Sequence, residues 1–158
     1  KAGQIAHNIA TTFSSTGTPA YFLHPSEAQH GDLGMVCESD VMLLISNSGK
    51  TREVLELVAL TRRMYPRLPF ILITGNSESP LSQLVDVTLS TGNPAEVCPL
   101  GLTPTTSTTV MTVLGDLLVV SVMQRIGFTY HDYSLRHHGG YLGDKSRELV
   151  SPEIEKKK

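Results

Sequence analysis

The sequence of 158 residues predicts an α/β fold with a parallel sheet. Short continuous apolar segments at Val41–Ile45, Phe70–Thr74 and Val87–Leu89 have the form of strands that are covered on both faces. Stretches with apolar residues at helical spacing alternate with them, as in parallel α/β sheets. A hydrophobic content of 40% in a chain of this length is enough for one domain with a core.

The other short elements follow from local patterns. Apolar residues at helical spacing predict a helix over residues 4–14, and the Gly-Thr-Pro turn after it leads into an extended run that predicts a strand at Ala20–Leu23. A further helix is expected from about Thr51 to Met64, where a proline follows, and a shorter one around Leu81–Val85.

A long helix is predicted from about Thr106 to Arg125, with Gly127 as its C-terminal cap. Its most apolar part, Val110–Met123, is shorter than the roughly 20 residues that a bilayer span needs. Because the helix is apolar on most sides, we expect it to be buried in the core or in an interface of a homo-oligomer. Residues 148–158 form a charged tail that we expect to be frayed.

Charge and cysteine content narrow the possible partners. The formal net charge is −2, and lysine clusters only at Lys156–Lys158, which argues against nucleic acid and anionic membranes as partners. Cys37 and Cys98 are too few for a disulfide framework, and no secretory signal is visible. We therefore expect a cytoplasmic protein, for which a small anionic ligand remains a suitable partner.

The junction between the first buried strand and the following helix has the composition of a phosphate-binding turn. Ser46, Ser48 and Thr51 supply short hydroxyl donors. Gly49 lets the backbone approach a ligand closely, and the first N–H groups of the helix direct partial positive charge to the same spot. Glu53 falls in the first turn of this helix, beside any ligand whose phosphate is anchored there.

Six sequence blocks are more specific than this turn alone, and one of them contains the unusual run Glu-Val-Cys-Pro-Leu-Gly-Leu. They are Ser15–Pro19, His24–Met35, Ile45–Gly49, Ile73–Gly75, Glu96–Thr109 and Gly139–Gly143.

In this order the blocks resemble those of arabinose-5-phosphate isomerases, which contain a sugar isomerase (SIS) domain. The resemblance implies such a domain over residues 1–147, with a three-layer α/β/α fold similar to flavodoxin and Rossmann folds, and a homotetramer. It implies interconversion of D-arabinose 5-phosphate and D-ribulose 5-phosphate through an enediol, which feeds the synthesis of the sugar Kdo of lipopolysaccharide and capsule. The family's opening strand is not seen, so we expect that an N-terminal part is missing. The regulatory cystathionine-β-synthase (CBS) pair that follows the isomerase domain in many relatives is not seen either, as expected of a truncated chain or of a shorter branch of the family.

An aldose–ketose isomerase needs a base at carbon, a group that handles the oxygen protons and a phosphate anchor. Neither a metal nor an organic cofactor is demanded by this route. The resemblance places Lys1, Glu53, Glu96 and His137 at catalytic positions, His30 at a substrate position, and Ser46, Asn47, Ser48 and Thr51 at the phosphate.

Several of these residues have an alternative role. Glu53 would also suit the helix dipole or a capping box, whereas Glu96 lies in a proline-rich connection with no helix to cap. Either glutamate is a candidate for the carbon base. Thr105 and Thr106 open the long helix, either as a second turn that contacts the substrate or as ordinary N-caps.

Which histidine takes part in catalysis, and whether any of them binds a metal, are separate questions. His137 precedes His138, which replaces the proline of the family's His-Pro-Gly-Gly run, and alignment without gaps selects His137 as the acid of ring opening. His24, His30 and Cys37 fit no compact zinc spacing, so no metal site is expected.

Two other functions remain open. One is isomerisation of a different phosphosugar, because the turn reads only the phosphate. The other is a non-catalytic phosphosugar sensor, since SIS domains also serve as regulatory modules. A later product of the pathway is a possible inhibitor at the same site.

Overall fold

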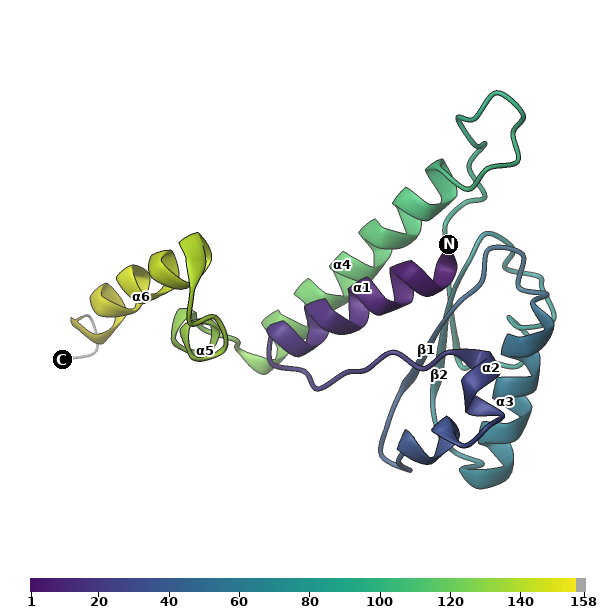
Figure 1. The fold of residues 1–158 in the computed structure, drawn as a ribbon, viewed down its shortest axis with the longest axis horizontal. Coiled ribbons are helices and arrows are strands. Elements are labelled where there is room, and N and C mark those ends of the chain that lie inside the picture. Colours follow the sequence, from purple (N-terminus) through teal and green to yellow (C-terminus); the bar gives the residue numbers. More distant parts are fainter. Residues whose placement is uncertain (156–158) are drawn as a thin grey trace. The chain divides into compact units, whose positions relative to one another are not determined.

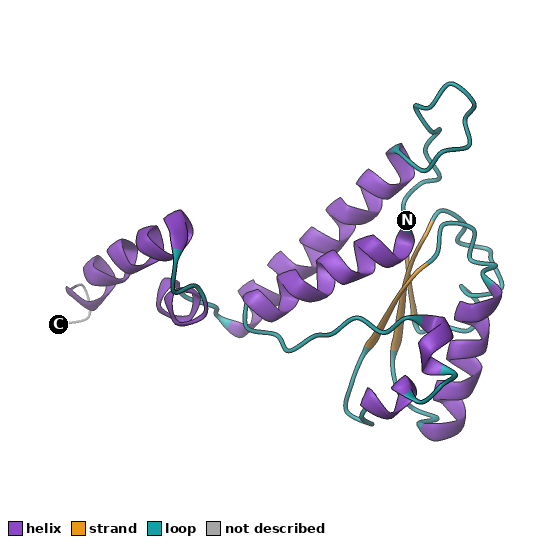
Figure 2. Cartoon of the chain, in the orientation of Figure 1, coloured by secondary structure: helices purple, strands orange, loops and turns teal. Residues whose placement is uncertain are grey.

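The computed structural model describes residues 1–155, which contain a parallel sheet and helices (Figures 1 and 2). The chain forms two units, and each is described by itself. The first consists of residues 1–8 and 22–114, and the second of residues 9–21 and the chain from Gly115 onward.

In chain order the elements are α1 (Ala2–Ser15), α2 (Pro25–Ala28), the 3-10 helix η1 (Asp32–Met35), β1 (Met42–Ile45), α3 (Arg52–Met64), β2 (Phe70–Thr74), β3 (Val87–Ser90), α4 (Thr106–Ile126), α5 (Tyr130–Arg136) and α6 (Gly140–Glu155). The sheet, α2, η1 and α3 belong to the first unit, and α5 and α6 belong to the second. Helices α1 and α4 have residues in both units.

The three strands lie in the order β1-β2-β3 and all run parallel. Ile45 at the end of β1 is in register with Ile73, which in turn is in register with Leu89. The carboxyl ends of the three strands therefore meet at one edge of the sheet. The predicted parallel sheet is confirmed, and each of these three strands lies within one residue of its predicted bounds.

Helix α3 forms because its apolar residues recur at the spacing of one helical face. Val54, Leu57 and Val58 are buried, and they belong to a core cluster with Leu44 of β1 and Leu72 of β2. The helix thus covers one face of the sheet (Figure 1). Its predicted bounds are confirmed to within one residue.

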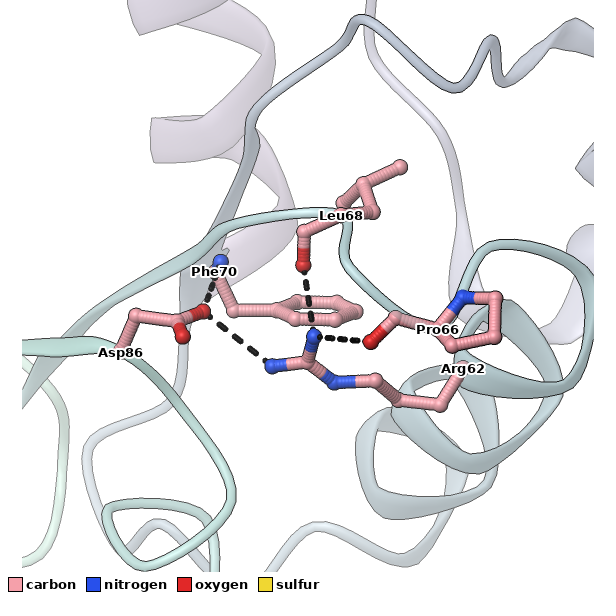
Figure 3. A network of polar contacts seen from close by, with 5 residues as sticks. All are labelled: Arg62, Pro66, Leu68, Phe70 and Asp86. Atoms are coloured by element: carbon pink, nitrogen blue, oxygen red, sulfur yellow. Dashed lines mark hydrogen bonds and ion pairs between the residues drawn. The ribbon is translucent and has the colours of Figure 1, made fainter.

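An arginine ties the end of α3 to the amino end of the sheet (Figure 3). Arg62 Nη1 donates hydrogen bonds to the carbonyls of Pro66 at 3.0 Å and Leu68 at 2.9 Å, and its guanidinium carbon lies 4.6 Å from the ring centroid of Phe70. Nη2 of the same guanidinium pairs with Asp86 Oδ2 at 3.2 Å, and this oxygen also accepts the N–H of Phe70 at 2.7 Å. This network lies at the opposite end of the strands from the predicted phosphate turn.

The predicted strand at Ala20–Leu23 is wrong, because this segment is an irregular connection in the structure. Its apolar character reflects side-chain packing and not a strand ladder. The Phe22 ring stacks on His7 with centroids 5.6 Å apart, and Leu23 packs against the core cluster.

The short helix expected around Leu81–Val85 is also wrong, because these residues form turns and a bend. The N–H of Ser82 bonds the hydroxyl of Ser79 at 3.2 Å instead of a backbone carbonyl. Serine side chains that capture backbone donors in this way compete with helix formation. Leu81 is still fully buried, which explains the apolar signal.

Helix α4 is present as predicted, but this chain buries only one of its sides. Gly115 and Val119 are buried, and Ile9 packs so closely on Gly115 that a β-carbon there would collide with it. Leu117 and Val120 are about half exposed, at 56% and 48%. The expectation of a helix buried in the core is therefore wrong, and the interface expectation stays a prediction.

By length and composition, α4 is the one helix within residues 1–155 that could cross a bilayer, and 22% of its most apolar stretch is buried. A single helix of this kind is weak evidence for a membrane span. The helix ends as predicted at Gly127, which has a φ of 65°, and the N–H of Phe128 reaches back to the carbonyl of Met123 at 3.0 Å.

Helix α6 extends to Glu155, past the point at which we expected the chain to fray. Residues 156–158 of the expected tail lie outside the described residues. Helix α5 was not predicted, although its start is a capping box. Thr129 Oγ1 accepts the N–H of Asp132 at 3.1 Å, and the Asp132 carboxylate accepts the N–H of Thr129 at 3.0 Å.

Candidate functional site

The predicted phosphate turn lies at the carboxyl end of β1 and is closed by its own hydroxyls. Ser46 Oγ lies 2.9 Å from Thr51 Oγ1 and accepts the N–H of Gly49 at 3.2 Å. Ser48 Oγ accepts the N–H of Lys50 at 3.2 Å. The end of the strand and the N-cap of α3 are thus joined through side chains, which holds the turn in one shape.

The turn is also fixed to the chain that follows β2. The carbonyl of Asn47 accepts the N–H of Gly75 at 3.0 Å and the Thr74 hydroxyl at 3.2 Å. The carbonyl of Gly49 accepts the N–H of Leu81 at 3.1 Å. These bonds use the turn's carbonyls and none of its side-chain hydroxyls.

Glycine is required at the centre of this turn. Gly49 has a φ of 62°, and a β-carbon there would collide with the Ser79 side chain. Gly75 is similarly confined, since a β-carbon would lie 2.6 Å from Asn47 Oδ1. The need for glycine at position 49 is evident from the sequence. The role of Ser79 is not, because this residue belongs to no recognisable sequence pattern.

The exposed donors of the turn suit a phosphate. Asn47, Ser48 and Thr51 are exposed, and Thr51 is the N-cap of α3 without making a side-chain capping bond. The first N–H groups of any helix lack intrahelical acceptors, and the positive end of the dipole favours an anion there. Ser46 differs from its neighbours, because it is only 3% exposed and its hydroxyl bonds within the turn to Thr51 and Gly49.

Glu53 is exposed in the first turn of α3. In the part of the chain that the structure describes, its carboxylate makes no hydrogen bond and no ion pair. The capping-box alternative for this residue is therefore not realised. This carboxylate lies one residue beyond the first residue of α3, next to the predicted phosphate turn, where its charge also acts on Arg52.

Glu96, in contrast, is fully engaged with the start of α4. Its Oε2 accepts the N–H of Thr105 at 2.7 Å, the Thr105 hydroxyl at 2.9 Å and the N–H of Ser107 at 3.3 Å, and its Oε1 accepts the Ser107 hydroxyl. These donors, the Ser107 hydroxyl foremost, lower the pKa of Glu96 to about 2. The expectation that Glu96 has no helix to cap is wrong.

Two hydroxyls at the start of α4, those of Thr105 and Ser107, donate hydrogen bonds to this carboxylate. Thr105 Oγ1 donates to Glu96 and accepts the N–H of Val97 at 3.1 Å. The hydroxyl of Thr106 is buried and has no partner among the residues that the structure describes. The anion at this helix start is therefore the Glu96 side chain, and the Thr105 hydroxyl oxygen accepts from Val97 and not from the first turn of α4.

The connection around Cys98 has a polar centre that the sequence analysis did not anticipate. Cys98 Sγ accepts the N–H groups of Thr103 at 3.1 Å and Leu102 at 3.2 Å. The hydrogen bonds from Thr103, first its backbone N–H, lower the pKa of the Cys98 thiol to about 7. The Cys98 sulfur thus fixes the loop that contains the unusual run Glu-Val-Cys-Pro-Leu-Gly-Leu by accepting two of its backbone N–H groups.

His30 lies exposed just after α2, and this short helix is tied to the start of α3. Gln29 Nε2 donates to Glu56 Oε2 at 2.8 Å, and Arg52 Nε donates to Glu56 Oε1 at 2.7 Å. His30 is the residue after Gln29 and thus lies in a segment that is tied to α3. His24 has a structural role, because its Nδ1 accepts the N–H of Ser26 at 3.2 Å as the N-cap of α2.

The remaining predicted residues lie at the chain start and in the second unit. Lys1 is exposed and directly precedes α1. His137 is half-buried as the C-cap of α5, where it contacts Tyr133. No three His, Cys, Asp or Glu side chains within residues 1–155 are grouped as a metal site requires.

Comparison with known proteins identifies the family. The SIS domain matches residues 1–121, more than half of the chain. The chain belongs to the SIS domain family. Among solved structures, this SIS domain resembles a Bacteroides fragilis protein described as a candidate phosphosugar isomerase involved in capsule formation. The two share 68% identity with a TM-score of 0.87 over 89% of this chain and 73% of the other.

Two further relatives carry a named ligand or activity. The Escherichia coli CFT073 protein c3406, solved in complex with arabinose 5-phosphate, shares 40% identity with a TM-score of 0.81 over 86% of this chain and 71% of that chain. Arabinose 5-phosphate isomerase KdsD of Shigella flexneri is 49% identical over 145 residues, which are 92% of this chain. The match spans only 44% of the length of that relative.

Proposed function

We propose that this SIS domain is an aldose–ketose isomerase that interconverts D-arabinose 5-phosphate and D-ribulose 5-phosphate through an enediol. The observation that carries the proposal is the exposed carboxylate of Glu53, which makes no hydrogen bond or ion pair within residues 1–155 and lies next to a turn that its own hydroxyls close. The 49% identity to a relative named arabinose 5-phosphate isomerase supports the choice of substrate.

The phosphate turn supplies the anchor. Asn47, Ser48 and Thr51 and the first N–H groups of α3 bind the ester oxygens, while the buried Ser46 keeps the turn in shape. Binding at a fixed turn places the carbon chain of the sugar over the first turn of α3. The reaction then becomes effectively intramolecular, which lowers its entropic barrier.

Glu53 is the better carbon base of the two glutamates. A base must accept the proton from the carbon beside the carbonyl, and its efficiency falls when its pKa lies far below the working pH. The pKa of Glu96 is lowered to about 2 by four hydrogen bonds, whereas Glu53 has none of them. We assign Glu96 to holding the start of α4 and Glu53 to moving the proton between C2 and C1.

The other site residues are proposed on the family resemblance. Lys1 neutralises substrate charge, His30 contacts sugar hydroxyls, and His137 assists ring opening. Thr105 acts through Glu96 and not on the sugar directly, since its hydroxyl and its N–H are both used by that carboxylate. Thr106 keeps its proposed place beside the substrate.

A direct turnover assay tests the proposal. Protein purified with a metal chelator is mixed with D-arabinose 5-phosphate, and the formation of D-ribulose 5-phosphate is followed by proton NMR. Conversion in both directions without added metal supports the isomerase. Tight binding of the sugar phosphate with no turnover would contradict it and favour a sensor, and turnover of only another phosphosugar would refute the assigned substrate.

We further propose that the enzyme is a cytoplasmic homotetramer that serves Kdo synthesis. Leu117 and Val120 of α4 are half exposed in the single chain, which supports an interface on that helix. Light scattering that gives the mass of one chain would contradict the tetramer. Competition assays with Kdo and its nucleotide-activated form test whether a later product inhibits the site.

A further inference from the structure

The rings of Tyr133 and His137 stack against each other at the end of α5. Their centroids are 3.8 Å apart and their planes differ by 9°. The two residues are four apart, so that they lie on the same face of the helix, one turn from each other. A histidine that is stacked this closely has its ring plane fixed.

The carbonyl of Tyr133 fixes the ring in a second way. His137 Nδ1 lies 3.0 Å from this carbonyl oxygen, which also accepts the N–H of His137 at 3.1 Å. A carbonyl oxygen can only accept, and it has two lone pairs for two donors. Nδ1 therefore carries a hydrogen, and the neutral imidazole has its unprotonated nitrogen at Nε2.

Further contacts hold Tyr133 itself. Phe128 meets its ring edge-on, with centroids 6.4 Å apart and an angle of 75°. Phe128 also packs on Gly17, where a β-carbon would lie only 2.8 Å from the Phe128 ring. Arg136 places its guanidinium carbon 5.5 Å from the Phe128 centroid. Tyr133 is thus supported by a packed cluster within the second unit.

The neighbouring His138 lacks such support. It is exposed, and within the described residues its only polar contact is made by its backbone carbonyl, which accepts Arg147 Nη1 at 3.3 Å. Behind His137, a β-carbon at Gly143 would collide with the His137 carbonyl, so the chain is also confined there. The structure therefore distinguishes the two adjacent histidines, of which only His137 has a fixed ring.

We propose that Tyr133 is a positioning residue that fixes the ring plane and the tautomer of His137. This inference rests on the proposed isomerase function, in which His137 opens the sugar ring. Neutral Nε2 takes the proton of the anomeric hydroxyl while the bond between C1 and the ring oxygen breaks, with its electron pair going to that oxygen. The same Nε2–H then returns the proton to the ring oxygen. The Nδ1–H bond stays unchanged throughout, because the Tyr133 carbonyl holds it.

The test uses the full chain and two readouts. Nitrogen-15 NMR of the imidazole gives the tautomer of His137 in the wild type and in Tyr133→Phe, Tyr133→Leu and the control Leu135→Ala, which removes an exposed apolar side chain of the same helix. Turnover assays give kcat and KM for each variant. His137→Asn identifies the signals of His137.

We expect Nδ1–H in the neutral wild-type ring. Tyr133→Phe keeps the stacked ring and should retain both the tautomer and kcat. Tyr133→Leu keeps the backbone carbonyl but loses the stack that aligns Nδ1 with it, so that the ring should populate both tautomers, with kcat lowered about 10- to 100-fold and KM little changed. Leu135→Ala should match the wild type.

Two results would overturn the inference. One is an Nε2–H tautomer in the wild type, and the other is a Tyr133→Leu variant with the wild-type tautomer and kcat. Failure of the proposed function gives a different result, because a wild type without turnover can still show Nδ1–H that is lost in Tyr133→Leu. That outcome would support the positioning role and refute the isomerase.

Discussion

The carboxylate of Glu96 accepts the backbone N–H of Thr105 at 2.7 Å and its hydroxyl at 2.9 Å, so a catalytic candidate is bound to the start of a helix. The positive end of α4 is thereby neutralised by the protein itself. The start of α3 differs, because the side chain of its N-cap Thr51 makes no capping bond, and within residues 1–155 the Glu53 carboxylate makes no hydrogen bond. Of these two helix starts, that of α4 is bound by a carboxylate and that of α3 is not.

Replacement of Glu96 should give a stability loss that depends on pH. The pKa of Glu96 is lowered from 4.5 to about 2 in the folded protein. A depressed carboxyl pKa stabilises the fold above the unfolded pKa, and this contribution is lost as pH falls toward the folded pKa. Thermal unfolding should show Glu96→Gln less stable than the wild type by a constant amount above about pH 5, with the gap shrinking between about pH 4.5 and 2. A gap of the same size at every pH would contradict the assigned hydrogen bonds.

Alanine at the centre of the phosphate turn should be far more damaging than alanine at another glycine of similar backbone geometry. Gly49 and Gly92 have φ values of 62° and 75°, but only Gly49 lacks space for a β-carbon. Gly92→Ala should cost about 1–2 kcal/mol in the free energy of unfolding, from backbone strain alone. Gly49→Ala should cost more and also weaken sugar-phosphate binding, as measured by calorimetry. Equal losses for the two variants would contradict the close contact with Ser79.

Removal of one exposed hydroxyl of the turn should weaken the binding of phosphorylated sugar only. Ser48 is exposed, and within residues 1–155 its hydroxyl makes one hydrogen bond, which it accepts from the N–H of Lys50. A hydrogen bond to a charged group is worth about 1.5–3 kcal/mol, so Ser48→Ala should raise KM roughly 10- to 100-fold with little change in melting temperature. Ser77→Ala, another exposed serine, is the control. An unchanged KM in Ser48→Ala would place the ester elsewhere.

The network at the amino end of the sheet should affect stability and leave catalysis unchanged. Asp86 accepts the N–H of Phe70 at 2.7 Å, and this bond is the main reason why its pKa is lowered. Asp86→Ala should reduce the free energy of unfolding by about 1–3 kcal/mol, as measured in urea, because the Phe70 donor is left unpaired. Asp86→Asn keeps an acceptor and should lose less. A large drop in kcat at a temperature where Asp86→Ala is folded would show that this end of the sheet reaches the active site.

The sequence was sufficient for the features that depend on neighbouring residues. The strands β1 to β3 and the helix α3 follow from local periodicity, and the turn between β1 and α3 follows from its small polar residues. The apolar segments at Ala20–Leu23 and Leu81–Val85 were misread, because burial of a few side chains gives the same pattern as a strand or a helix.

The role of Glu96 at the start of α4 could not be predicted from the sequence for a different reason. Its partners Thr105 and Ser107 are 9 and 11 residues away, across a connection whose path no local pattern gives. The hydroxyl run of Thr105–Thr109 was the available signal, but neither alternative considered for Thr105 named Glu96 as its partner. The stack of Tyr133 on His137 has the helical spacing of four residues, but α5 itself was not expected.

The measurement that tests the account most directly is kcat for the isomerisation of D-arabinose 5-phosphate by Glu53→Gln and by Glu96→Gln, with folding checked for both. If Glu53 is the carbon base, Glu53→Gln should lower kcat by about 10²–10⁴-fold at unchanged melting temperature, whereas Glu96→Gln should lose stability and retain more of its turnover. A Glu53→Gln variant that turns over at the wild-type rate would contradict the account.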